Sequence, residues 1–283
     1  MSAHQCLDHL ILFVPVDPEI QFPKLPSFFE KNFAITPGGH HADGATSNTL
    51  ILLADGCYIE LISFVDTAKA TDHWWGPNPA YVGWKDWCLT NSHSPEESHD
   101  GVRETHIKPI QGGRKRADGV DVKWAVTFPK GEKGGQDIRG RIPFFCHDIT
   151  DRSIRVPISA DRTTHPCGAL GVQQLTIVVR DRSLLNETKA AYASILGSEG
   201  LQRGDESYFR LKRVYQVQAL VTGPTIVLRL PKDRAETDAS LKTGFSCGDV
   251  VLGVEAGGNK RLGSKERLDG GEEDVRGLWL EYV

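Results

Sequence analysis

Short apolar runs alternate along the chain with polar connectors that contain glycine and proline. The first run, CLDHLILFV at residues 6–14, predicts a strand because it is short and rich in branched side chains. Ser27 predicts the N-cap of a short helix over residues 28–33. Asp55–Gly56 is a strong two-residue turn signal and predicts a hairpin of two strands within residues 47–65. The beginning of the chain therefore predicts a strand, a helix, a loop and then at least two strands.

The same order of elements recurs near the end of the chain. VQQLTIVV at residues 172–179 predicts a strand, and Ser183 predicts the N-cap of a helix that ends at about Leu196. Gly197 follows at the position where helices commonly end on a glycine. We expect this late unit to repeat the first with longer loops, over strand-rich segments at residues 208–214, 217–230, 249–255 and 278–283.

This repeat predicts an α+β protein built from copies of one unit. Residues 1–80 form the first copy and residues 161–283 the last, with long loops. Between them, residues 81–160 contain three predicted strands and a predicted helix at residues 94–104. Two interpretations of this middle region stay open, namely a degenerate third copy of the unit and an insertion.

Composition limits the classes of function. The 283 residues carry 33 basic and 37 acidic side chains, and this balance gives no electrostatic case for nucleic-acid binding by the whole chain. No apolar run approaches the ~20 residues that a membrane-spanning helix needs, so we expect no membrane association. The sequence has no GxGxxG, Walker or GxSxG motif, which leaves nucleotide and serine-hydrolase chemistry without support. We expect a small-molecule substrate, and a homodimer stays open.

Cysteine usage and the N-terminus predict the compartment. The six cysteines are scattered and form no CxxC pair. This favours free, mostly buried thiols in a reducing compartment over three disulfides. Residues 1–7 show no basic segment followed by an apolar one, so no secretory signal is expected. We therefore expect a cytoplasmic protein.

Two ionisable residues stand inside apolar predicted strands. His9 lies in LDHLILFV and Glu60 in YIELISFV, each on a face that it shares with apolar side chains. An ionised carboxylate on such a face costs several kcal/mol unless a cation, a metal or a proton accompanies it. Each residue alone has an ordinary structural explanation, as a satisfied core histidine or as a glutamate on the solvent face of its strand. Together, on the first and last strands of one unit, they favour a shared site.

The late unit offers matching residues. Aligning LDHLILFV with VQQLTIVV places Gln174 at the position of His9, and aligning YIELISFV with LWLEYV places Glu281 at the position of Glu60. Two such half-sites that face each other would supply two neutral ligands and two carboxylates to one divalent cation. We therefore predict one metal site formed by these four residues.

Three segments of the chain resemble the vicinal oxygen chelate (glyoxalase/bleomycin resistance/dioxygenase) superfamily, and more narrowly its glyoxalase-like domain proteins. They are LDHLILFVPVD at residues 7–17, ITPGGHHADGATSNTLILLADGCYIELISF at residues 35–64 and HPCGALGVQQLTIVVRD at residues 165–181. The resemblance implies repeated βαβββ modules that form a cupped mixed sheet around a chelated metal. It implies ligands at the strand positions of His9, Glu60, Gln174 and Glu281.

The resemblance also implies an activity. We expect a glyoxalase-like lyase or isomerase that depends on a divalent metal (Zn, Ni, Mn or Fe) and acts on a small molecule with vicinal oxygens. In this scheme Glu281 moves a proton, Glu60 anchors the metal, and no residue is expected to bind another cofactor. Two alternatives stay open. A non-haem Fe(II) extradiol-type dioxygenase would use His9, a further histidine and Glu60, and a metal-free binding or resistance protein of the same fold would not depend on these residues.

A different pairing of the units changes the ligand set. If the middle region pairs with the first unit, its ligand positions hold Trp87 and Phe144 or Phe145, which cannot bind a metal. The half-site of His9 and Glu60 would then need help from histidines in loops.

The loop histidines are His40, His41 and His165. The first two follow Gly38–Gly39, which allows a tight turn, and the third precedes a proline. His41 and His165 lie just upstream of strands that should line the cup, so we name these two as candidate catalytic residues. Each could serve as a third metal ligand, a general base or a hydrogen-bonding group for the substrate. A polar loop tip is the structural alternative for both.

Two further features belong to the middle region. The basic run Arg114–Arg116 lies in the polar, Gly-rich stretch 112–119, which predicts a solvated surface loop, as does the stretch 130–140. An anion or substrate-phosphate contact is the alternative for the basic run. Five of the six tryptophans fall within residues 74–124. We expect them to fill the core of this region, and an aromatic wall on a substrate pocket is the alternative.

Overall fold

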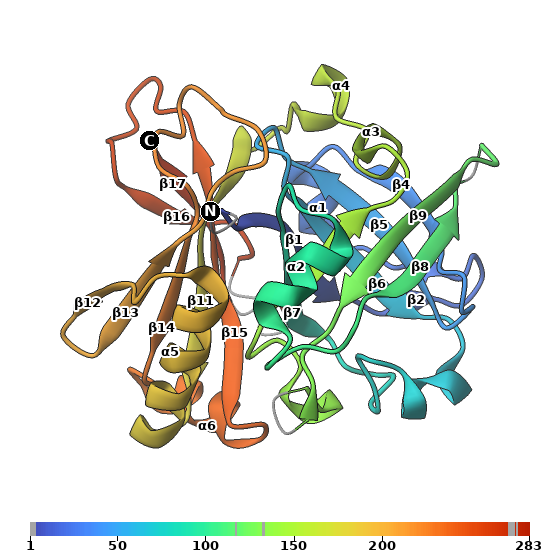
Figure 1. The fold of residues 1–283 in the computed structure, drawn as a ribbon. Helices are drawn as coiled ribbons and strands as arrows, with labels where there is room; N and C mark the ends of the chain where they lie inside the picture. The colour runs from blue at the N-terminus through green and yellow to red at the C-terminus, as the bar shows by residue number, and fades with distance from the viewer. Residues whose placement is uncertain (1–3, 117, 132–133, 271–274, 276) are drawn as a thin grey trace.

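The computed structural model describes residues 4–116, 118–131, 134–270, 275 and 277–283. Its strands form two large mixed sheets that stand side by side, with helices packed around them (Figure 1). The first sheet and its helices comprise β1 (Cys6–Phe13), α1 (Ser27–Asn32), β4 (Thr36–His40), β5 (Thr46–Leu52), β6 (Tyr58–Phe64), β7 (Gly83–Thr90), α2 (Pro95–Val102), β8 (Ile110–Lys115), β9 (Asp121–Thr127) and β10 (Phe144–Asp148). The second comprises β11 (Ala169–Val179), α5 (Arg182–Leu196), β12 (Leu201–Arg203), β13 (Glu206–Arg210), β14 (Thr225–Arg229), α6 (Arg234–Leu241), β15 (Phe245–Val254), β16 (Lys265–Arg267) and β17 (Leu278–Tyr282). The connections contain β2 (Val16–Asp17), β3 (Phe22–Pro23), α3 (Arg152–Arg155), α4 (Ala160–Thr163) and short 3-10 helices over Thr67–Asp72 and Gln136–Ile138.

The first sheet is shared by the first unit and the middle region. Its strand order is β4-β5-β6-β1-β7-β10-β9-β8. At its centre β1 runs antiparallel to β7, while β1 is parallel to β6 and β7 is parallel to β10. The middle region therefore has the same strand–helix–three-strand order as the first unit, and its strands complete the same sheet. The predicted pairing of the first unit with the late unit is wrong, because hydrogen bonds between β1 and β7 join the first unit to the middle region instead.

The second sheet holds the late unit. Its strand order is β12-β13-β14-β11-β15-β17-β16. β11, α5 and the next three strands form another βαβββ module, and β15, β16 and β17 form a shorter partner for it. The predicted α+β fold of repeated modules in cupped mixed sheets is confirmed.

Local signals located the helices α1, α2 and α5 and the C-terminal end of α5, but not the N-cap residues of α1 and α5. Gly197 ends α5 in the left-handed region, at φ 64°, as its position predicts. Asp181, and not Ser183, caps this helix, because the carboxylate accepts a backbone N–H of the first turn. Ser27 is the first residue of α1 and not its cap, because Pro26 occupies the N-cap position, where no side chain forms a capping hydrogen bond. The hairpin turn at Asp55–Gly56 is confirmed by the pairing of β5 with β6.

The polar stretch 112–119 is not a loop throughout. Residues up to Lys115 belong to β8, which pairs with β9. Gly112 allows this pairing, because a Cβ there would lie 2.5 Å from the indole nitrogen of Trp124. Residue 117, and residues 132–133 of the other predicted loop, lie outside the described residues. Strand pairing and the packing of Trp124 thus override the low strand propensity of a Gly-rich, basic segment.

The structure also bears on the expectations about membrane-spanning helices and free cysteines. Within the described residues, no helix has both the length and the apolar character that a membrane crossing requires. The six cysteines are free, and four of them are buried. The expectation of free, mostly buried thiols is therefore confirmed.

One apolar core connects the two sheets. Trp87 on β7 meets the ring of Tyr192 on α5 edge-on, with centroids 5.6 Å apart, and both belong to the same buried cluster. The hydroxyl of Tyr192 donates a hydrogen bond of 2.6 Å to the backbone oxygen of Arg141. A fully buried aromatic ring that also satisfies a buried carbonyl ties α5 to the first sheet.

We expect Tyr192→Ala to lower the free energy of unfolding by about 3–5 kcal/mol, because it leaves a cavity between the sheets and an unpaired carbonyl. Tyr192→Phe is the matched control and should cost only about 1–2 kcal/mol, since it removes the hydroxyl alone. Urea denaturation of both variants measures the difference. Equal costs for the two variants would contradict the packing role of the ring.

Candidate functional site

The first sheet curls until its two edges meet, and this encloses a cavity. His41 forms an isolated antiparallel bridge to Arg114 of β8, and the N–H of Ala42 donates to the oxygen of Gly113 at 3.0 Å. The cavity inside has a volume of about 250 Å³. Polar side chains and aromatic rings from both the first unit and the middle region line it, among them His9, His41, Asn48, Glu60, Trp74, Trp75, Arg114, Trp124, Phe128 and Phe144.

Two imidazoles converge on one carboxylate in this cavity. The Nε2 atom of His9 lies 3.6 Å from Oε2 of Glu60, and Nε2 of His41 lies 3.4 Å from Oε1. Donors that bind one cation at ~2.0–2.2 Å sit roughly 3–3.5 Å from one another. Two imidazoles and one carboxylate are also the ligand types that Zn, Fe, Mn and Ni accept. The ligand types therefore suit a divalent metal. The two imidazoles contact different oxygens of Glu60, however, and among the described residues only Asp8, His9 and Cys88 offer one ligand atom each within 4.8 Å of one another, so a shared cation would require the imidazoles to move closer together.

Both imidazoles are held at their other nitrogen. Nδ1 of His9 bonds Oδ2 of Asp8 at 2.7 Å, and Nδ1 of His41 bonds Oγ1 of Thr46 at 2.6 Å. A carboxylate only accepts hydrogen bonds, so neutral His9 carries its proton on Nδ1 and keeps the lone pair of Nε2 for the cavity. A metal-binding histidine is oriented in this way by a carboxylate on its outer nitrogen.

Asp8 reaches His9 because β1 is irregular at this point. The pairing of β1 with β7 shifts register between Leu7 and His9, so Asp8 is an extra residue, and such bulges redirect side chains. Asp8 is fully buried and pairs with Arg152 at 2.5 Å and with Arg155 at 2.9 Å. Burial acts to raise the pKa of Asp8, but the two guanidinium charges outweigh it and hold the pKa well below its usual value.

Asn48 fixes Glu60 from the other side. Its Nδ2 donates to Oε1 of Glu60 at 2.7 Å, and its Oδ1 accepts the N–H of Gly39 at 3.0 Å. This approach requires glycine in β4, because a Cβ on Gly38 would lie 2.0 Å from Oδ1 of Asn48. The Gly38–Gly39 pair thus serves close packing against Asn48 and positions the segment that carries His41.

The electrostatics keep Glu60 ionised. Burial acts to raise the pKa of Glu60, but when the imidazoles are protonated, the hydrogen bond and charge of His41, the charge of His9 and the amide of Asn48 lower it to about 2. The carboxylate is therefore charged throughout the neutral range and needs positive partners in the cavity.

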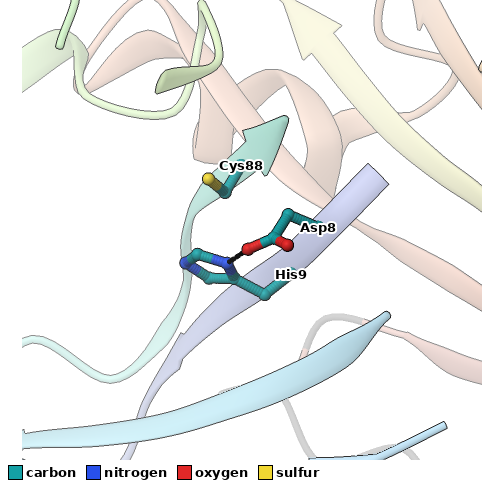
Figure 2. Close-up of side chains that lie close together, drawn as sticks. All are labelled: Asp8, His9 and Cys88. Carbon is teal, nitrogen blue, oxygen red and sulfur yellow. Dashed lines mark hydrogen bonds and ion pairs between the residues drawn. The ribbon is translucent and has the colours of Figure 1, made fainter. Parts of the chain in front are cut away.

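A second group of metal-binding atoms lies on the opposite side of the His9 ring. Asp8, His9 and Cys88 each have a ligand atom within 4.8 Å of the others (Figure 2). The oxygens of Asp8 are already bonded to the two arginines and to His9, so a cation there would displace buried ion pairs. Burial also raises the pKa of the Cys88 thiol well above its usual value, and this favours the protonated thiol. The cavity side of His9 is the better candidate.

The structure brings together only part of the predicted site. His9, Glu60 and His41 line one cavity, but Gln174 and Glu281 lie in the second sheet, on β11 and β17. Gln174 does occupy the strand position that matches His9. His9 pairs with the first residue of β6, and Gln174 pairs with the first residue of β14, the parallel neighbour of its own strand. The equivalent of Glu60 in that module is a residue of β14, because β17 pairs with β15 and not with β11. Of the four predicted ligands, only His9 and Glu60 line this cavity.

His165 also lies apart from the cavity. Its Nδ1 accepts the N–H of Ala34 at 3.1 Å, and its Nε2 bonds the oxygen of Leu52 at 2.9 Å. Both ring nitrogens are thus used by backbone groups, which leaves no free lone pair. Its position indicates that it links the end of α1 to β5.

Sequence reasoning missed several groups of the cavity. Asn48 lies in the predicted strand before the Asp55–Gly56 hairpin. Nothing in the sequence distinguishes it from a polar strand residue without a role in the site. His73 and Asp43 also line the cavity, and Nε2 of His73 lies 3.3 Å from Oδ2 of Asp43. The hydrogen bond from His73 leads the causes that lower the Asp43 pKa to about 2. This ion pair joins two connections that are 30 residues apart in sequence, a proximity that local patterns do not predict.

The tryptophans divide between the two proposed roles. Trp84 and Trp87 are buried in the main core, as expected. Trp74, Trp75 and Trp124 line the cavity, which was the alternative interpretation. The middle region therefore contributes Trp124 to the aromatic wall of the site as well as core residues, while Trp74 and Trp75 come from the end of the first unit.

Comparison with known proteins supports the fold. The family model described as a glyoxalase-like domain matches residues 7–196. A hypothetical protein from Staphylococcus aureus, 14% identical, aligns over 99% of this chain and 100% of its own with a TM-score of 0.69. A methylmalonyl-CoA epimerase from Mycobacterium tuberculosis, 11% identical, covers 50% of this chain and 85% of its own with a TM-score of 0.31. A halotolerant catechol dioxygenase, 12% identical, covers 89% and 71% with a TM-score of 0.35. No curated protein matches the chain.

The low pKa of Glu60 predicts how acid affects the metal-free protein. A carboxylate whose folded pKa lies below its unfolded value of 4.5 stabilises the fold above pH 4.5, and this stability is lost as the pH falls toward about 2. The advantage of the wild-type protein over Glu60→Gln should therefore shrink by about 2 kcal/mol between pH 7 and pH 3. Denaturant titration at both pH values measures it, and an advantage that stays constant would refute the charged state of Glu60.

Proposed function

Since the chain belongs to the glyoxalase-like domain family, we propose that it is a divalent-metal-dependent enzyme that acts on a small molecule with two neighbouring oxygen atoms. The observation that carries the proposal is the approach of His9 and His41 to the two oxygens of Glu60. Both imidazoles are held at Nδ1 and turn Nε2 toward the cavity, as metal-binding histidines do, although Nε2 of His41 also lies 3.3 Å from Nδ2 of Asn48.

In this proposal His9, His41 and Glu60 hold the metal, which can be Zn, Ni, Mn or Fe. When bound, such a cation polarises the oxygens of the substrate and stabilises negative charge that develops on them. Asp8 and Thr46 fix the orientation of the imidazole rings through hydrogen bonds at Nδ1, and Asn48 holds the carboxylate of Glu60. The aromatic walls exclude water from the space beside the metal.

The ligand set favours dioxygenation. Two histidines and one carboxylate form the facial triad that is typical of non-haem Fe(II) oxygenases. The lyase or isomerase scheme relied on Gln174 as a ligand and on Glu281 as the base, and both lie in the other sheet. We therefore place Fe(II)-dependent cleavage of a vicinal diol-type substrate first among the reaction classes.

One observation keeps lyase or isomerase chemistry as a second candidate. His73 lies in the cavity wall with its Nε2 near the carboxylate of Asp43. An imidazole backed by a carboxylate can accept a proton from a substrate and return it. In His73 that role would require the long 3.3 Å hydrogen bond from the N–H of Trp75 to Nδ1 to open first. His73, and not Glu281, would then act as the base.

Metal binding tests the ligand set directly. The wild-type protein should bind about one equivalent of Fe(II) or Zn(II) after treatment with a chelator. His41→Ala, His9→Ala and Glu60→Gln should each weaken binding by at least ~100-fold, because a ligand matters more than the groups that orient it. His40→Ala is the matched control, since His40 is an exposed neighbour of His41, and it should bind normally, as should His165→Ala. Loss of binding in His165→Ala but not in His41→Ala would contradict the proposal.

The two reaction classes differ in their need for oxygen and for His73. Dioxygenation predicts oxygen uptake by the Fe(II)-loaded protein with catechol-type compounds, lost in His41→Ala and changed less than about tenfold in His73→Ala. Oxygen-electrode traces give the first result. Solvent proton exchange into a 2-hydroxy ketone without oxygen, lost in His73→Ala, would instead select the lyase or isomerase class.

A further inference from the structure

Arg114 differs from every other buried arginine in the described part of the chain. Six arginines have less than a tenth of their surface exposed. Five of them have a carboxylate oxygen within 4 Å, namely Arg139, Arg141, Arg155, Arg213 and Arg229. Arg114 is 6% exposed and forms no such ion pair with any described residue. A buried guanidinium without a counter-ion is costly, so its retention calls for an anion.

The head of Arg114 has unused hydrogen-bonding capacity. Its Nη1 is buried and has no hydrogen-bond partner among the described residues. Its Nη2 reaches only the backbone oxygen of Arg155, at 3.5 Å. A guanidinium presents five donors in a planar fork that fits a carboxylate in a two-point contact.

Arg114 faces the same space as the proposed metal site. It lines the cavity together with His9, His41 and Glu60, and the carboxylate of Glu60 is near enough to act on its charge. If Glu60 holds a divalent cation, its charge no longer compensates Arg114. The cavity would then carry net positive charge and attract an anionic substrate.

The rest of the cavity sets the shape of that substrate. Its walls include the rings of Trp74, Trp124, Phe128 and Phe144. Its volume of about 250 Å³ lies just below the ~300 Å³ lower bound of common ligand sites. The space suits a single small ring and is too small to enclose a glutathione adduct.

We propose that Arg114 binds the carboxylate of the substrate, and that the substrate class is a small aromatic acid with vicinal hydroxyl groups. This inference rests on the proposed function, because the vicinal oxygens are assigned to the metal held by His9, His41 and Glu60. Arg114 is then the residue that determines specificity for an acid over a neutral diol.

A second, outer hollow also touches Arg114. It is lined by Arg116 and Arg162 among others. Arg116 already donates to Asp118 at 2.6 Å, and Arg162 donates to the oxygen of Pro157 at 3.2 Å. Their engaged guanidinium groups make the outer hollow a weaker anion site than the cavity, and they provide controls.

The test compares 3,4-dihydroxybenzoate with its neutral analogue 3,4-dihydroxybenzamide by calorimetry, on both metal-free and metal-loaded protein. We expect the acid to bind the wild-type protein at least ~10-fold more tightly than the amide. Arg114→Gln should remove this preference in both forms of the protein while metal stoichiometry stays unchanged. Arg162→Gln, the matched loss of charge on the outer hollow, should keep the preference.

Stability provides a second readout. Because Arg114 has no counter-ion, Arg114→Gln should unfold at the same temperature as the wild-type protein or at a higher one, whereas loss of a structural ion pair would lower it. Arg114→Lys keeps the charge without the fork and should retain only part of the preference. If Arg114→Gln fails to fold, Arg114→Lys decides the matter by the same comparison.

The outcomes separate the two claims. Acid preference that persists in Arg114→Gln, or that disappears in Arg162→Gln, overturns the role of Arg114. A wild-type protein that binds no metal but prefers the acid through Arg114 would refute the proposed function and leave the anion site standing.

Discussion

A carboxylate kept charged inside a β-sheet cup is the constraint on which the site depends. Glu60 is 4% exposed, and its charge is stabilised by two imidazoles and one amide. A charge in this position is tolerated only when its partners are placed accurately. The bulge at Asp8, the glycine pair of β4 and the hydrogen bond between Thr46 and His41 all serve that placement.

The network behind His9 couples the site to the fold. Asp8 is bonded to Arg152 and Arg155, which belong to α3 and follow the last strand of the middle module. The end of this module therefore reaches back to the first strand of the chain and locks His9 from behind. His9 also stacks on Tyr58, with ring centroids 4.6 Å apart. Orientation of the imidazole is thus a product of the complete first sheet and cannot form in the first module alone.

Local sequence patterns predicted the modules but not their pairing. Turn and cap signals act over a few residues, so the Asp55–Gly56 hairpin and the end of α5 at Gly197 were predictable. The choice of partner for the first module depends on which strand edges meet. The late unit resembles the first unit more closely in sequence, and this similarity led to the prediction that the two pair. Because of this, Gln174 was matched correctly to His9 in strand position yet assigned to the wrong cavity.

The candidate site was predictable where a polar residue interrupts an apolar strand, as at His9 and Glu60. His41 was named only as one of two loop histidines, because its approach to Glu60 depends on closure of the sheet against β8. Arg114 was obscured by its basic, Gly-rich surroundings, which are typical of surface loops. Its burial follows from the pairing of β8 with β9 and from the bridge to His41, contacts between segments distant in sequence.

The most direct test of the central claim is X-ray absorption spectroscopy of the Zn(II)-loaded protein. We expect a first coordination sphere of nitrogen and oxygen atoms at ~2.0–2.2 Å, with multiple scattering from two imidazoles and no sulfur. Sulfur at ~2.3 Å would place the cation beside Cys88, behind His9, and would contradict a metal centre formed by His9, His41 and Glu60.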